Sequence, residues 1–117
     1  MKVLKKLRDS YVINHANRTR LPFFDSSNKV RRKVVFSGRV QNVGFRLELV
    51  CLAERLGLAG WVRNREDGSV EAELQGEEAK IDFLIKCMQS LKRASVKEMI
   101  VTDLPVDKED ETFKIVK

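Results

Sequence analysis

The chain has 117 residues, of which 43% are hydrophobic and 34% charged, a size and composition typical of one compact domain. No window approaches the roughly 20 consecutive apolar residues of a membrane-spanning helix, and the start has no uninterrupted apolar secretory segment. We therefore expect a cytoplasmic protein with no membrane span. The two cysteines, Cys51 and Cys87, lie far apart and far from the single histidine, His15. This spacing disfavours a Cys/His metal site, a disulfide scaffold and a serine–histidine triad.

The formal net charge of +6 is concentrated at the N-terminus. Residues 1–29 hold seven basic and two acidic side chains, a net charge of +5, whereas the remainder holds sixteen basic and fifteen acidic side chains. A nucleic-acid-binding domain carries its basic excess on the folded part of the chain. Because the body is nearly neutral, we expect no nucleic-acid partner.

Residues 1–29 are irregular in pattern, and we interpret them as a basic, flexible N-terminal extension that precedes a domain over residues 30–117. Within the extension, Leu4, Leu7 and Tyr11 recur at helical spacing among basic residues. A frayed, solvated segment is the simplest interpretation. A surface or partner-binding helix and a targeting leader are the alternatives.

The rest of the chain alternates short apolar runs with two helical patterns. The expected elements are a strand over Val34–Phe36, a helix over about 45–56, strands over Gly60–Asn64 and Ser69–Leu74, a helix over about 77–91, and closing strands over Val96–Val101 and Phe113–Val116. This βαββαβ order predicts an α+β fold of the split βαβ, ferredoxin-like type, an antiparallel sheet with two helices on one face. The fold alone names no function.

The segment between the first strand and the first helix carries the strongest chemical signal. The first turn of a helix has unpaired backbone N–H groups whose partial positive charge favours an anion. Gly38 and Gly44, with Asn42 as a residue type that tolerates a left-handed backbone, would let these amides curve around a phosphate. Arg46 would add a permanently charged, planar donor at the rim.

Two motifs in this order carry a family resemblance. Gly-Arg-Val-Gln-Asn-Val-Gly-Phe-Arg occupies residues 38–46, and Gly-Trp-Val-Arg-Asn-Arg-Glu-Asp-Gly-Ser-Val-Glu occupies residues 60–71. From about Val34 to Val116 the chain resembles the acylphosphatases, and the resemblance does not extend to the N-terminal residues. It implies an enzyme that hydrolyses small acyl phosphates to a carboxylate and inorganic phosphate.

The resemblance also implies roles for individual residues. The loop formed by Gln41, Asn42, Val43, Gly44, Phe45 and Arg46 would bind the substrate phosphate. Arg46 and Asn64 would be the catalytic residues, the first binding phosphate and the second positioning the attacking water. Because alignment of water and neutralisation of charge suffice for a substrate with a good leaving group, we expect no metal and no cofactor. Inorganic phosphate or sulfate should compete for the loop, and we expect a monomer.

The chain departs from the family pattern inside the loop, where Asn42 stands in place of a usual glycine. Asparagine accepts a positive φ at modest cost, so we expect slower catalysis at most. Residues 47–49 are Leu-Glu-Leu where the family often places aromatic residues. The alternative function is a catalytically idle acylphosphatase-like module that binds a protein or nucleic-acid partner.

Overall fold

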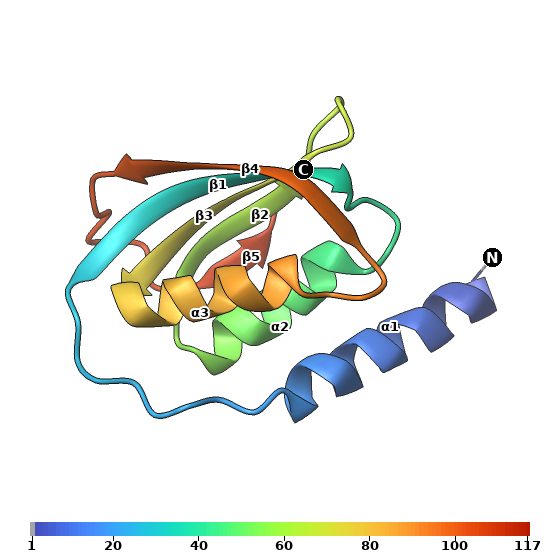
Figure 1. The fold of residues 1–117 in the computed structure, drawn as a ribbon, viewed down its shortest axis with the longest axis horizontal. Helices are drawn as coiled ribbons and strands as arrows, with labels where there is room; N and C mark the ends of the chain where they lie inside the picture. The colour runs from blue at the N-terminus through green and yellow to red at the C-terminus, as the bar shows by residue number, and fades with distance from the viewer. Residues whose placement is uncertain (1) are drawn as a thin grey trace.

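The computed structural model describes the backbone of residues 2–117 and the side chains from Lys5 onward. Its elements are α1 (Lys2–Arg18), β1 (Lys29–Arg39), α2 (Phe45–Arg55), β2 (Ala59–Asn64), β3 (Val70–Glu77), α3 (Glu78–Gln89), β4 (Ser95–Leu104) and β5 (Phe113–Ile115). The strands form one sheet in the order β4-β1-β3-β2-β5, in which only the β2–β5 pair is parallel. Helices α2 and α3 cover one face of this sheet (Figure 1). The fold is therefore α+β and ferredoxin-like, as the sequence predicted.

The core lies between the sheet and the two covering helices. Val70, Ala72 and Leu74 of β3 are fully buried, and these are the residues that the alternation of the hairpin placed on one face. The helices meet this face with side chains that recur at the helical period and are at most 1% exposed: Phe45, Leu49, Leu52, Ile81, Leu84 and Met88. Packing of both helices therefore fixes the position of the first turn of α2 relative to the sheet.

The first strand is longer than its apolar run predicted, because it begins at Lys29 rather than at Val34. Its ladder with β3 pairs Lys29 with Glu77 at one end and Phe36 with Val70 at the other. Arg31, near the N-terminal end of β1, is 7% exposed, and the carboxylates of Glu73 and Asp110 bind its guanidinium. A charged residue at this position gives no strand signal in the sequence, and only its partners from distant segments make the burial favourable.

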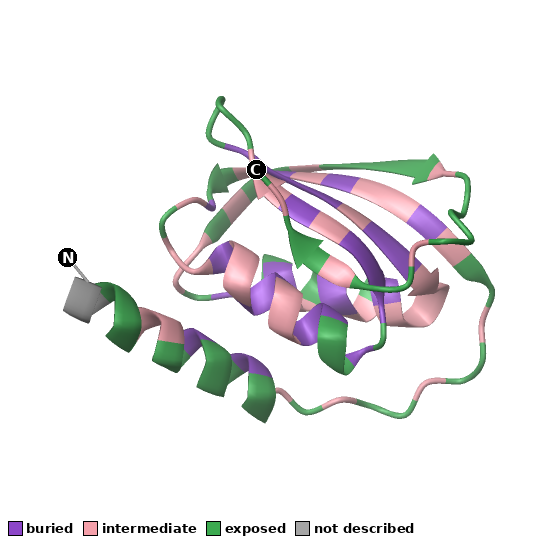
Figure 2. Ribbon diagram, turned by 180° about the vertical axis from the view of Figure 1, so that it is seen from behind, coloured by how far each residue is buried: buried purple, intermediate pink, exposed green. Residues whose placement is uncertain are grey.

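The N-terminal residues differ in local conformation from the irregular extension expected from the sequence. Residues 2–18 form helix α1, which packs along α2 (Figures 1 and 2). Val12 and Ala16 are fully buried, whereas Leu7 and Tyr11 are 63% and 60% exposed. The buried stripe is thus not the one that the spacing of apolar residues indicated, and the side chain of Leu4 lies outside the described residues.

Helix α1 is also held at its C-terminal end. Arg55 of α2 donates hydrogen bonds from Nη1 to the carbonyl oxygens of Ala16, at 2.6 Å, and Thr19, at 2.7 Å. A charged donor on the last carbonyls of a helix satisfies groups that the helix itself leaves unpaired. The helix is thereby anchored to α2 by packing and by hydrogen bonds, while the division of the chain at residue 29 stays a prediction.

Candidate active site

The loop between β1 and α2 adopts the backbone that an anion site requires. Asn42 has a φ of 63°, the one positive φ at a non-glycine residue in the described chain, and Gly44 has a φ of 75° as the N-cap of α2. The expectation that Asn42 takes a left-handed conformation is confirmed. No side chain caps α2, and none of the backbone amides of residues 41–47 donates a hydrogen bond to a described residue. These amides are therefore available to a ligand.

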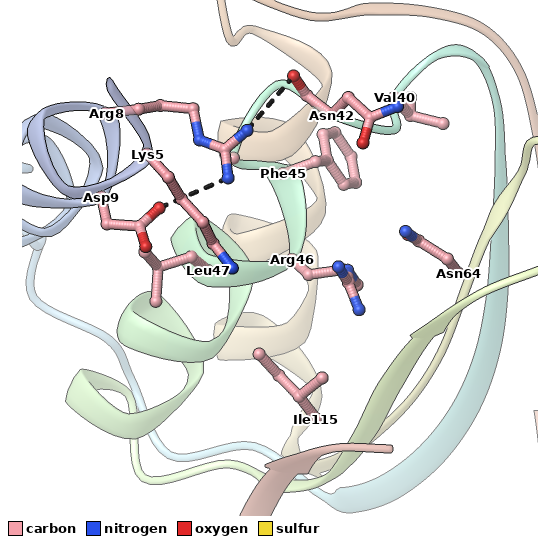
Figure 3. A pocket seen from close by; sticks show the side chains of 11 residues that line it. Lys5, Arg8, Asp9, Val40, Asn42, Phe45, Arg46, Leu47, Asn64 and Ile115 are labelled. Carbon is pink, nitrogen blue, oxygen red and sulfur yellow. Dashed lines mark hydrogen bonds and ion pairs between the residues drawn. The ribbon is translucent and has the colours of Figure 1, made fainter. Parts of the chain in front are cut away.

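The first turn of α2 forms one wall of an open pocket of about 300 Å³ (Figure 3). Its lining residues come from α1, the loop, α2, β2 and β5: Lys5, Arg8, Asp9, Val40, Asn42, Gly44, Phe45, Arg46, Leu47, Asn64 and Ile115. The structure thus brings Asn42, Gly44, Phe45, Arg46 and Asn64 together from the set that the sequence suggested. A pocket of this size suits a small molecule.

Two of the suggested residues, Gln41 and Val43, do not line the pocket with their side chains. Gln41 donates from Nε2 to the carbonyl oxygens of Arg65, at 2.8 Å, and Ser69, at 2.9 Å, which ties the loop to the β2–β3 hairpin. The carbonyl oxygen of Val43 accepts a hydrogen bond of 2.8 Å from Nε of Arg93. Any contact of these two residues with a ligand would therefore be through their backbone amides.

Arg46 and Asn64 face each other across the pocket. Arg46 projects from the first turn of α2 toward Asn64, which ends β2 on the opposite side (Figure 3). Arg46 forms no ion pair with any described residue, in contrast to nearby Arg63, whose Nε lies 2.7 Å from Oε1 of Glu71. Oδ1 of Asn64 is buried and has no hydrogen-bond partner among the described residues. The guanidinium of Arg46 can bind an anion, and the amide of Asn64 has a donor and an acceptor that suit a water.

Arg93 supports the loop from behind. Besides its bond to Val43, its Nη2 lies 3.4 Å from the carbonyl oxygen of Gly44 and 2.6 Å from Oε1 of Glu48. Glu48 is fully buried on α2, and its Oε2 lies 2.9 Å from Nδ1 of His15 on α1. This chain of contacts connects α1, α2 and the loop, and it fixes the carbonyl groups of Val43 and Gly44 on Arg93, which does not line the pocket.

Sequence reasoning missed the contribution of α1 to the pocket. Lys5, Arg8 and Asp9 line it, and a Cβ added to Gly44 would lie 2.6 Å from Cγ2 of Val12. The helix could have been found from the spacing of Val12 and Ala16, which lie one turn apart. The position of α1 beside the pocket has no local signal in the sequence, because the residues that α1 contacts are about thirty or more positions away along the chain.

Other site types receive no support from the described residues. Among these residues no group of three or more His, Cys, Asp or Glu side chains is arranged to hold a metal ion. No described helix combines the length and the apolar character needed to cross a membrane. Burial raises the pKa of the Cys51 and Cys87 thiols, which disfavours the reactive thiolate form.

Comparisons with known proteins show which family and which fold the chain resembles. Residues 32–115 match the family model described as Acylphosphatase. Over 82 residues the chain is 45% identical to a protein named Acylphosphatase from Bifidobacterium longum, which covers 69% of this chain and 84% of that relative. The crystal structure of acylphosphatase from Bacillus subtilis superposes with a TM-score of 0.71 and 31% identity, covering 75% of this chain and 99% of the other.

A further similarity is to part of a larger protein. Full-length HypF in a phosphate- and nucleotide-bound form matches with a TM-score of 0.68 and 29% identity, over 86% of this chain and 13% of the HypF chain. A segment of the same architecture therefore occurs both by itself and as a small part of a longer polypeptide.

Proposed function

Because this chain belongs to the acylphosphatase family, and so is an enzyme that hydrolyses acyl phosphates, we propose that residues 41–46 and Arg46 bind the substrate phosphate and that Asn64 positions the attacking water. One observation carries the proposal: the free amides at the start of α2, the unpaired guanidinium of Arg46 and the unsatisfied amide of Asn64 meet in one pocket. This juxtaposition supports the roles that we propose for the individual residues.

Phosphate binding uses fixed dipoles and one charge. The backbone amides of the loop donate to the phosphoryl oxygens, and the partial positive charge at the start of α2 adds to the attraction. Arg46 supplies the full positive charge and two parallel donors. Since the loop is fixed by Gln41 and Arg93, these donors need little rearrangement when charge develops in the transition state.

The chemical step is attack of water on phosphorus. The water oxygen forms a bond to phosphorus as the bond from phosphorus to the acyl oxygen breaks, and the acyl half leaves as a carboxylate. One proton of the water passes to a phosphoryl oxygen, so the products are the carboxylate and dihydrogen phosphate. The planar amide of Asn64 offers both a hydrogen-bond donor and an acceptor, so it can hold and orient the water without any change in its own charge.

The direct test uses benzoyl phosphate as substrate and inorganic phosphate as ligand. We expect hydrolysis of benzoyl phosphate, inhibited competitively by inorganic phosphate or sulfate. In an NMR titration with phosphate, the amide signals of residues 41–46 should move first. Largest shifts at the opposite end of the sheet would contradict the assignment of the loop.

The alternative is a catalytically idle module, for which the occurrence of this fold within the much longer HypF chain is the supporting observation. Phosphate binding at the loop without hydrolysis of benzoyl phosphate would favour this alternative. A nucleic-acid-binding assay run in parallel distinguishes a module that binds nucleic acid from one that binds a protein, because only the first gives binding in that assay.

A further inference from the structure

Helix α1 lies outside the matched family segment, which begins at residue 32, and yet it forms part of the pocket wall. Lys5, Arg8 and Asp9 line the pocket beside Asn42 of the loop and Leu47 of α2. In Figure 3 the side chain of Lys5 reaches from α1 to the vicinity of Leu47, and Arg8 extends over the loop. This chain therefore adds its own charged residues to the family site.

The pocket is lined by two cations in addition to Arg46. Among the described lining residues the cations are Lys5, Arg8 and Arg46, and the one acid is Asp9. The loop amides and Arg46 already serve the phosphate in the proposed function. Two cations from α1 remain beyond that requirement, and a single acid offsets only one of them.

Lys5 and Arg8 face solvent and lack strong partners among the described residues, since Lys5 is exposed and the Arg8 side chain is 38% exposed. Arg8 contacts the carbonyl oxygen of Asn42 and Oδ1 of Asp9 only at 3.5 Å, the outer limit for a hydrogen bond. Its Nε is buried and has no hydrogen-bond partner among the described residues. Lys5 makes no ion pair with a described residue. By contrast, Arg55 and Arg93 make bonds of 2.6 Å to their partners.

We propose that Lys5 and Arg8 form a second anion subsite, which binds a carboxylate or phosphate group carried on the acyl half of the substrate. The inference rests on the proposed function, because the first anion is the scissile phosphate at Arg46. The preferred substrates are then acyl phosphates with two anionic ends. The subsite is held in place by Val12, which packs against Gly44, and by the contact of His15 with Glu48.

The test compares three benzoyl phosphates, two of which have the same shape and differ in charge. Benzoyl phosphate carries one anionic end, and 4-carboxybenzoyl phosphate carries two, while 4-carbamoylbenzoyl phosphate controls for the size of the added group. We expect the full-length protein to prefer the carboxylated substrate over the carbamoyl substrate about fivefold in kcat/KM, the scale of one or two partly exposed ion pairs. The preference should lie in KM, because the distant charge is unchanged during the reaction. It should shrink with added salt.

The variants separate the subsite from a general basic field. The double variant Lys5→Gln/Arg8→Gln should lose the preference. The double variant Lys6→Gln/Arg18→Gln, which also removes two positive charges but from exposed positions on the same helix outside the pocket, should retain it. Asp9→Asn should increase the preference, a change that a merely structural role of α1 does not produce. Circular dichroism confirms that each variant folds.

The outcomes distinguish this inference from the proposed function. Equal kcat/KM for the carboxylated and carbamoyl substrates in the unmodified protein overturns the second subsite alone. An equal loss of preference in Lys6→Gln/Arg18→Gln and in Lys5→Gln/Arg8→Gln also overturns it, because the effect then comes from net charge. If the unmodified protein hydrolyses none of the three substrates, the proposed function fails and the inference fails with it.

Discussion

Replacement of Gly44 by alanine tests whether α1 packs against the phosphate-binding loop. Gly44 has a φ of +75°, and a Cβ built there would lie 2.6 Å from Cγ2 of Val12. The left-handed backbone costs an alanine about 1–2 kcal/mol. The contact adds an overpacking cost of about 1–3 kcal/mol. We therefore predict that Gly44→Ala lowers the free energy of unfolding by about 2–5 kcal/mol.

Gly57→Ala supplies the matched control. Gly57 has a similar φ of +68°, but a Cβ built there has no atom within 4 Å. This variant carries the backbone cost alone, about 1–2 kcal/mol. The reduced entropy of the unfolded chain, which favours alanine over glycine, is the same in both variants and cancels in the comparison. The difference between the two substitutions isolates the contact with α1.

Val12→Ala completes a double-mutant cycle. It removes the atom that clashes, so in this background Gly44→Ala should cost no more than Gly57→Ala. Urea unfolding followed by circular dichroism gives each free energy of unfolding from the midpoint and slope. If Gly44→Ala costs the same with Val12 as with alanine at that position, α1 does not pack on the loop and the reasoning is refuted.

Three further predictions concern the surroundings of the site. Arg93→Gln should lower the free energy of unfolding by about 3 kcal/mol, because it leaves the buried Glu48 with one partner fewer. Calorimetry should also show weaker phosphate binding, and unchanged binding would contradict the supporting role of Arg93. Asn42→Ala should cost about 1 kcal/mol and Asn42→Gly almost nothing, because φ is 63° there; equal unfolding midpoints would contradict this. Burial alone would raise the pKa of Glu71, but Arg63 and then Lys33 hold that pKa below its ordinary 4.5. The resulting stabilisation is present above pH 4.5 and is lost as the pH falls through the folded-state pKa. Glu71→Gln should therefore flatten the acid limb of a profile of stability against pH. An unchanged acid limb would contradict this prediction.

The fold could be predicted from the sequence wherever burial follows a simple period. The apolar stripe from Phe45 to Leu52 located α2, and the alternation of Val70, Ala72 and Leu74 located β3 and its buried face. Both signals are local, because the residues that form the buried face of each element lie within that element. The ends of β1 could not be predicted in this way, since Arg31 is buried by partners that the chain supplies much later.

The candidate site likewise has a part that local sequence patterns predict and a part that depends on distant segments of the chain. The loop could be predicted because its glycines, Asn42 and Arg46 form one short segment, and Asn64 entered through the second motif of the family resemblance. The contribution of α1 could not, because Lys5 and Arg8 reach the pocket only through the docking of Val12 and His15 on α2. Arg93 was missed for the same reason, since its contact with Val43 joins segments 50 residues apart.

The central claim is that Arg46 binds the phosphate and Asn64 acts on the water, and paired measurements on Arg46→Ala and Asn64→Ala test it most directly. Phosphate affinity and turnover of benzoyl phosphate are measured for both variants. Arg46→Ala should lose affinity and turnover together, because its charge contacts the phosphate in the ground state and in the transition state. Asn64→Ala should keep its phosphate affinity and lose at least about 10²-fold in turnover. Near-normal turnover in Asn64→Ala, or near-normal phosphate affinity in Arg46→Ala, would contradict the account.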